Sequence, residues 1–189
     1  MNQILEWLLG GDLRSDGLST EVADFVLANP QLIDELLEGL DESQDLVRGR
    51  TADALEKIGR VKPELIVPSL PKLIDVAKDD PLPMVKMHIA MLFGHLAMYA
   101  EHVGAIMHAL QGMLDDQSVF AKSWAIASLC ILGRKYPQER DCIVERIAQL
   151  QGDESVAIRT RVRNALIVLT DETAAFPKGW IKSQHLKDV

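Results

Sequence analysis

A repeat of about 37 residues restricts the fold of this chain more than any other feature of its sequence. Four basic residues mark the repeat, at spacings of 38, 36 and 37 positions: Arg48, Lys86, Lys122 and Arg159. An acidic residue stands six positions before each of them: Glu42, Asp80, Asp116 and Asp153. A period of this length is typical of stacked units, each of which buries its apolar side against its neighbours.

Within each repeat, apolar residues recur at the spacing of a helix. A large aliphatic residue lies ten positions after each base: Ile58, Leu96, Leu132 and Leu169. Together with the residues at offsets −1, +3, +6 and +7, these side chains form one stripe along a helix, whereas a strand would alternate. A second apolar helical stretch follows each first one, so every repeat is predicted to be a helix, a turn and a helix.

The chain is therefore predicted to be all-α, with a repeat array between two capping segments. The array covers 19–170, in units 19–40, 42–78, 80–114, 116–151 and 153–170. A capping helix and loop are expected over 1–18, and a capping tail over 171–189, with the aromatic residues of the tail packed over the open end of the array.

The repeats resemble the HEAT-repeat family over roughly residues 19–170. The resemblance rests on the acid-to-base spacing of six, on small residues such as Ala52 and Ala90, and on the pattern Leu-x-x-Ile/Leu-Gly that ends at Gly59 and Gly133. It implies a right-handed α-solenoid, an armadillo-type α-α superhelix, of about four to five helix pairs. It also implies that the acids and bases form a structural ladder that ties one turn to the next.

The charge of the chain argues against nucleic acid as its main partner. The 189 residues have a net charge of −8, and residues 1–42 hold ten acids and one base. A nucleic-acid groove is expected to be basic. No basic, apolar leader opens the sequence and no apolar run of eighteen residues occurs, so we predict a cytoplasmic protein without a membrane span.

One candidate metal site lies in the second full repeat. His88, Met91 and His95 share a helix face, and imidazole with thioether would suit copper. The same face of the preceding repeat carries charge, which predicts a solvated outer surface: Arg50, Asp53 and Lys57. No compact ligand cluster is evident, so no metal and no cofactor are predicted, and copper binding at the three residues stays open.

The same outer face is apolar in the third full repeat, at Trp124, Ala127 and Ile131. Either the C-terminal tail folds over these residues, or they form an interface with another chain. We expect Trp124 and Ile131 to be the contact of a homo-oligomer in the second case.

In the HEAT-like family the second helices line the concave surface, where binding is expected. The non-core positions there mark a protein- or peptide-binding face: Lys72, Asp75, His108, Gln111, Asp141 and Glu145. The chain contains no nucleotide-binding or nucleophile motif. We therefore predict a non-enzymatic protein-interaction module.

Two alternatives remain. The first is a DNA-binding protein resembling the alkylpurine DNA glycosylases, which would need a basic groove with aromatic residues and an aspartate. Asp141 alone does not meet that pattern, and Trp124 falls on the outer face. The second is an enzyme-partner subunit resembling the phycobilin lyases, for which no residue decides either way.

Overall fold

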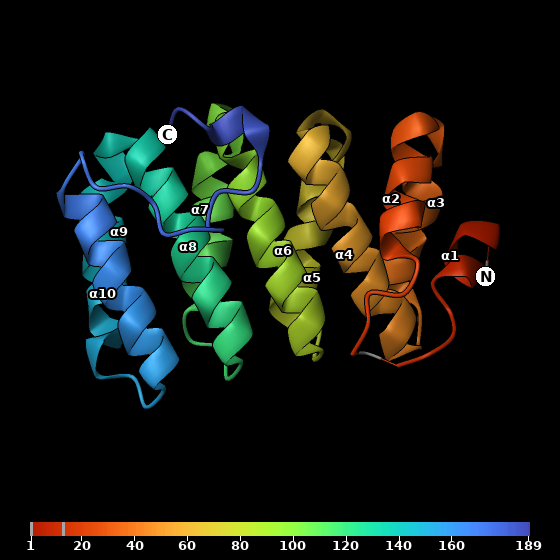
Figure 1. Ribbon diagram of the computed structural model, residues 1–189, viewed down its shortest axis with the longest axis horizontal. Coiled ribbons are helices and arrows are strands. Elements are labelled where there is room, and N and C mark those ends of the chain that lie inside the picture. Colours follow the sequence, from red (N-terminus) through yellow and green to blue (C-terminus); the bar gives the residue numbers. More distant parts are fainter. Residues whose placement is uncertain (1, 13) are drawn as a thin grey trace.

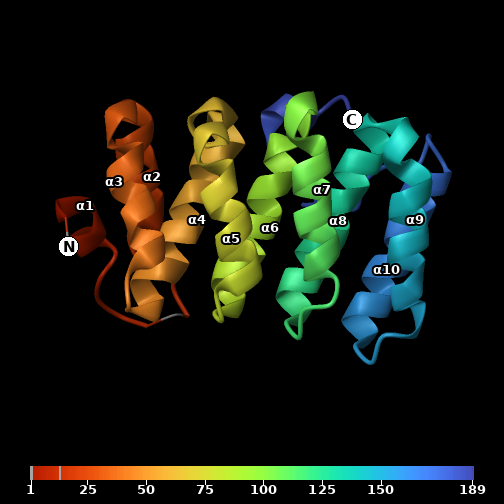
Figure 2. The ribbon, with the colours of Figure 1, turned by 180° about the vertical axis from the view of Figure 1, so that it is seen from behind.

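The computed structural model describes residues 2–12 and 14–189, so Met1 and Leu13 of the predicted segment 1–18 lie outside it. Its helices stand side by side in two layers (Figure 1). The first layer contains α2 (Ser19–Ala28), α4 (Asp45–Val61), α6 (Pro83–His95), α8 (Val119–Lys135) and α10 (Val156–Thr170). The second contains α3 (Ile33–Leu37), α5 (Leu70–Asp79), α7 (Val103–Met113) and α9 (Arg140–Ala148), which face the viewer in Figure 2.

A short helix, α1 (Gln3–Trp7), precedes the array. Short 3-10 helices extend or join the longer ones: Pro30–Leu32, Glu38–Asp41, Pro63–Leu65, Val67–Ser69, Leu96–Met98, Ala100–His102, Pro137–Glu139, Gln149–Gly152 and Gln184–Leu186. Within 2–12 and 14–189 no strand occurs, so the predicted all-α class is confirmed. None of the described helices is both long and apolar enough to cross a bilayer.

The aliphatic stripe of the repeats forms the core between the layers. Ile58, Leu96, Leu132 and Leu169 are fully buried, and they belong to one apolar cluster that runs from α1 to the tail. Neighbouring first-layer helices also pack closely against each other. A Cβ atom at Gly94 of α6 would lie 2.6 Å from the hydroxyl oxygen of Ser128 on α8, so this crossing accepts only glycine without a shift.

The acids and bases of the repeat meet between neighbouring units. Arg48 reaches the carboxylate of Asp80 at 2.9 Å. Two lysines bind the next aspartate along the array in the same way, Lys86 with Asp116 at 2.7 Å and Lys122 with Asp153 at 2.6 Å. Each of these three bases therefore bonds the acid of the following unit.

Each of these aspartates also holds the start of its own unit. Its second oxygen accepts a hydrogen bond from a backbone N–H two residues later, at Leu82, Ser118 or Ser155. The two ends of the series differ. Arg48 bonds the backbone carbonyl of Glu42, and Arg159 bonds the carbonyls of Asp153 and Glu154.

Candidate functional site

Charged side chains lie buried on the first layer, around α4 and α6. Arg50, Glu56 and His95 are at most 2% exposed, and Asp53 is 7% exposed. The prediction of a solvated outer surface at Arg50, Asp53 and Lys57 is therefore wrong. The described residues of the N-terminal loop, 8–12 and 14–18, and the C-terminal tail cover this face, and both are distant from α4 in the sequence.

Arg50 organises the N-terminal loop. Its guanidinium donates to the backbone carbonyls of Leu8 at 2.7 Å, Gly10 at 2.6 Å and Asp12 at 3.2 Å. Gly17 has a φ of +54°, and a Cβ atom there would lie 2.5 Å from the central carbon of the guanidinium. The loop thus wraps a buried cation whose charge is met by carbonyl dipoles.

Asp53 joins α4 to α2. Its carboxylate accepts from the Ser19 hydroxyl at 2.5 Å and from the Lys57 ammonium at 2.7 Å. The Lys57 ammonium in turn donates to Ser19 and Thr20. Asp53 is therefore hydrogen-bonded within the fold.

Glu56 is the most buried carboxylate of the group. It accepts from the Arg60 guanidinium at 2.5 Å and lies 2.9 Å from Nε2 of His95, while the Lys182 ammonium is 4.0 Å away. Burial by itself raises the pKa of Glu56, but His95, Arg60 and Lys182 together lower it to about 2. The carboxylate is ionised under all ordinary conditions.

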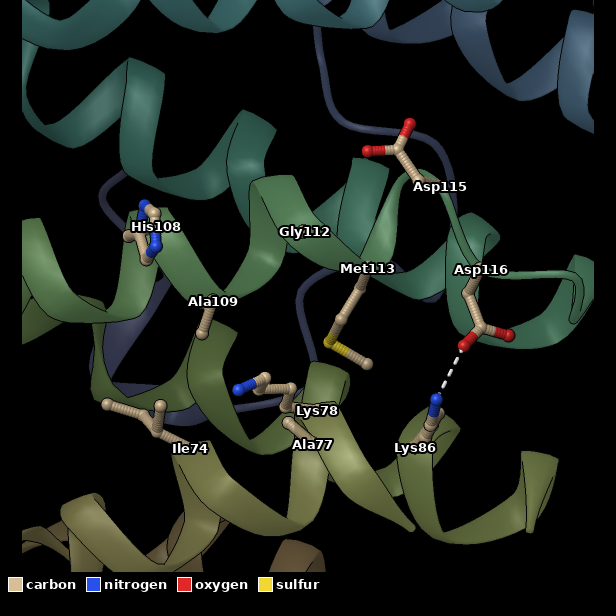
Figure 3. A pocket seen from close by; sticks show the side chains of 10 residues that line it. All are labelled: Ile74, Ala77, Lys78, Lys86, His108, Ala109, Gly112, Met113, Asp115 and Asp116. Atoms are coloured by element: carbon tan, nitrogen blue, oxygen red, sulfur yellow. Dashed lines mark hydrogen bonds and ion pairs between the residues drawn. The ribbon is translucent and has the colours of Figure 1, made fainter. Parts of the chain in front are cut away.

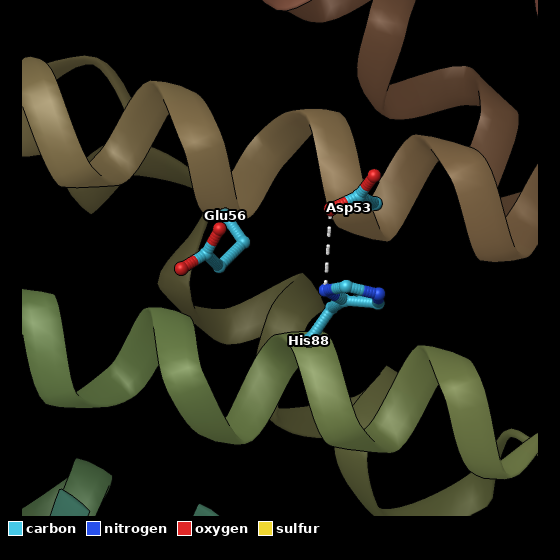
Figure 4. A group of neighbouring side chains, drawn as sticks. All are labelled: Asp53, Glu56 and His88. Atoms are coloured by element: carbon cyan, nitrogen blue, oxygen red, sulfur yellow. Dashed lines mark ion pairs between the residues drawn. The ribbon is translucent and has the colours of Figure 1, made fainter. Parts of the chain in front are cut away.

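Figure 4 shows Asp53 and Glu56 on α4 facing His88 on α6. One ligand atom from each of the three lies within 4.8 Å of the other two. Burial is the main reason that the pKa of His88 is lowered, and Asp53 and Glu56 only partly oppose it. Nδ1 of His88 is 3.5 Å from Asp53 and makes no hydrogen bond with any described residue.

The three residues of the copper hypothesis have separate partners. The Met91 sulfur accepts from Lys182 at 3.2 Å, His95 faces Glu56, and His88 faces Asp53. The structure does not bring His88, Met91 and His95 together as one ligand set. The group that it does assemble includes Asp53, which sequence reasoning placed in solvent, and Glu56, which sequence reasoning did not single out.

The tail, residues 171–189, returns across the first layer from α10 to α4 (Figure 1). Trp180 is buried, the Ser183 hydroxyl donates to the carbonyl of Arg60, and the His185 ring lies 2.8 Å from the carbonyl of Val61. The tail thus lies along the array, where we had expected it to pack over the open end.

The apolar outer face of α8 is covered. Arg161 lies between the rings of Trp124 and Trp180, 5.0 Å and 4.6 Å from their centres, and Lys182 stands 4.7 Å from the centre of Trp124. Ile131 is only 2% exposed. Of the two alternatives for this face, the structure shows the first, because the chain's own tail and helices lie over Trp124 and Ile131.

A cavity of about 320 Å³ lies between the loop, α4, α6 and the tail. All of the residues that line it except Met84 are polar or charged: Arg14, Ser15, Asp16, Arg50, Asp53, Glu56, Lys57, Arg60, Met84, His88 and Lys182. None of the residues predicted for partner binding belongs to it. A comparison of equivalent positions would have singled out Asp53 and Glu56, which stand where the repeat of Lys122 has the uncharged residues Ala127 and Cys130.

A groove of different character lies on the second layer, between α5 and α7 (Figure 3). It consists of two adjoining hollows of about 400 Å³ and 590 Å³ that share Ile74. Ala77, Ala109 and Met113 line the first hollow, and Val67, Leu70 and Ala105 line the second. Sequence reasoning missed these residues because it considered polar positions of the second helices.

Two of the six predicted partner-binding residues line this groove, Asp75 and His108. Lys72 instead bonds Asp41 at 2.5 Å and the carbonyl of Leu37 at 3.0 Å, which links two repeats. The remaining three lie farther along the second layer. Gln111 contacts the sulfur of Cys142 at 3.5 Å, and Asp141 and Glu145 are exposed on α9.

No protein-family profile and no curated protein matches the sequence. In structure, the chain is similar to a designed armadillo repeat protein, with a TM-score of 0.58, 19% sequence identity, and coverage of 88% of this chain and 80% of that one. A likeness at this identity concerns the fold. The chain is a repeat α-solenoid of the armadillo and HEAT type, as its period of about 37 residues predicts.

Proposed function

We propose that this protein is a non-enzymatic interaction module, and that it binds an extended segment of a protein partner in the groove between α5 and α7. The observation that carries this proposal is the groove itself. It offers a continuous apolar lining on the outer surface of the second layer, and it extends across two neighbouring repeats. Concave apolar surfaces of this kind are where ligands bind most often.

The side chains of the groove suggest how a segment would be held. Ile74, Ala109 and Met113 provide a floor for an apolar side chain. Lys78 stands at the rim, where it can pair with an acidic residue of the bound segment, whereas Asp115 is already paired with Arg146 at 2.5 Å. An apolar centre with a polar rim is the usual arrangement of a protein interface.

The charge of the groove favours a protein over a nucleic acid. The hollow at Ile74 is lined by two lysines, of which Lys86 is already paired with Asp116, and by a second acid at Asp115. A nucleic-acid groove would carry a row of bases with free charge. The DNA-glycosylase alternative gains no support from this surface.

Gly112 allows a sharp test. A Cβ atom at Gly112 of α7 meets nothing within 4 Å, so a tryptophan there fills the groove without disturbing the core. Gly152 is equally open and lies in the Gln149–Gly152 turn, outside the groove, which makes Gly152→Trp the matched control.

Affinity purification would first name candidate partners, and calorimetry would then measure each purified partner against the wild type and both variants. We expect Gly112→Trp to weaken binding at least about tenfold, because it displaces the inserted side chain, and Gly152→Trp to bind as the wild type does. Equal affinity for all three proteins would rule out the groove as the interface.

A further inference from the structure

We propose that the cavity on the first layer, enclosed by the N-terminal loop, α4, α6 and the tail, binds a small molecule through its phosphate or carboxylate group. This oxyanion site is separate from the groove between α5 and α7, since the two lie on different layers of the array. Two of its cations, Arg60 and Lys182, have N–H groups without an oxygen partner among the described residues.

The fold does not require charge at these positions. Asp53, Glu56 and Lys57 stand five, eight and nine residues after Arg48 in the repeat. At the same offsets after Lys122, α8 carries three residues that are buried and uncharged: Ala127, Cys130 and Ile131. Burying ionised groups costs free energy that an apolar residue would save. A site that retains them across several segments is a candidate for binding.

The carboxylates of the cavity are already engaged. Asp53 accepts from Ser19 and Lys57, and Glu56 accepts from Arg60 and faces His95. Of the four oxygens of these two groups, only Oδ1 of Asp53 accepts no hydrogen bond from a described residue, and it lies 3.5 Å from Nδ1 of His88.

By contrast, some N–H donors of the cavity have no oxygen acceptor among the described residues. The Lys182 ammonium has three N–H groups, and its hydrogen-bond partner is the weakly accepting sulfur of Met91. Nε of Arg60 is a buried N–H donor with no hydrogen-bond partner among the described residues, and Nδ1 of His88, which donates or accepts according to its tautomer, has none either. The group that would complete this site must supply acceptors, as an oxyanion does.

The charge of the lining also favours an anionic ligand. Five cationic side chains and three acidic ones line the cavity, in a chain whose net charge is −8. A divalent metal at Asp53, Glu56 and His88 would instead add charge beside Lys57, Arg60 and Lys182. An anion is favoured, and a volume of about 320 Å³ suits a small one.

Calorimetry on the full chain tests the proposal. Inorganic phosphate and malonate are titrated separately, with chloride keeping the ionic strength constant. We expect one equivalent of at least one of them to bind, and the better ligand identifies the group as phosphate or carboxylate.

Lys182→Met keeps the aliphatic stem beside Trp124 and removes the ammonium, so we expect it to weaken this binding at least about tenfold. Lys78→Met, which removes an exposed lysine of α5, is the control and should bind as the wild type does. Intrinsic tryptophan fluorescence checks that the tail of Lys182→Met remains in place.

Failure of both anions to bind would overturn the proposal, as would equal binding by wild type and Lys182→Met. Binding of Mn²⁺ that Glu56→Gln abolishes, without binding of either anion, would replace it with a metal site. Gly112→Trp is expected to leave anion binding unchanged, so this result and the test of the groove can fail independently.

Discussion

The two layers of this solenoid use the same repeats in opposite ways. Around α4 and α6, the first layer buries charged residues beneath a loop and the tail. Between α5 and α7, the second layer leaves apolar residues in an open groove. In an isolated helix pair one would expect the reverse, with charge outside and apolar residues covered. Each layer therefore departs from what stacking alone requires, and both departures mark candidate binding surfaces.

The two layers also differ in how much space they leave for a larger side chain at a glycine position. First-layer helices are closely packed on several sides, whereas the outer side of α7 faces open space. The first layer should therefore respond strongly to small changes and the second layer weakly. Four measurements of stability test this difference between the two layers.

The largest effect is expected from Arg50→Met. The variant leaves the backbone carbonyls of Leu8, Gly10 and Asp12 without their donor beneath the loop, which should lower the free energy of unfolding by about 3 kcal/mol or more. Urea unfolding measures the change, and limited proteolysis should show earlier cleavage in residues 8–18. Arg163→Met, on the exposed side of α10, is the control. Equal stability of the two variants would mean that the loop does not depend on this cation.

Acid should destabilise the first layer through Glu56. The pKa of Glu56 is about 2 in the folded chain against an ordinary value of 4.5, so its contribution is fully present above pH 4.5 and is lost as the pH falls towards about 2. The contribution amounts to about 3 kcal/mol. Urea unfolding as a function of pH should show a shallower decline for Glu56→Gln than for the wild type.

The exposed Glu101 supplies the control for this acid experiment. Glu101→Gln should retain the pH dependence of the wild type. A wild-type slope in Glu56→Gln would show that the buried carboxylate does not carry the effect.

Gly94→Ala tests the close packing of the first layer. The added methyl group would displace the Ser128 hydroxyl, which donates to the carbonyl of Ala90 at 2.6 Å. Overpacking of this kind should lower the free energy of unfolding by about 1–3 kcal/mol. Thermal and urea unfolding provide the measurement, and a neutral result would show that α6 and α8 can separate at little cost.

The smallest effect, of opposite sign, is expected from Gly112→Ala on the second layer. The methyl group meets no neighbour, and alanine reduces the conformational freedom of the unfolded chain, so stability should rise by up to about 1 kcal/mol. The same unfolding experiments compare it with Gly94→Ala. A loss of stability here would contradict the open groove.

The array could be predicted well from the sequence because its signal is local and repeated. The spacing of Ile58, Leu96, Leu132 and Leu169 places each of them on the buried side of a helix, and all four are buried. The candidate sites were predicted less well. Asp75 and His108 line the groove, but Asp53 was assigned to solvent on the ground that charged residues are usually exposed, and Glu56 was not singled out at all.

By itself, the sequence determined that this chain forms stacked helix pairs, since a period of about 37 residues and a helical apolar stripe leave few other ways to bury the core. Which faces of those helices the loop and the tail cover could be learned only from the folded structure. The Ser183 hydroxyl of the tail meets the carbonyl of Arg60 across 123 positions, and the Arg50 guanidinium meets Leu8 across 42. Such contacts depend on where the loop and the tail pack against the array, and no local sequence pattern specifies that packing.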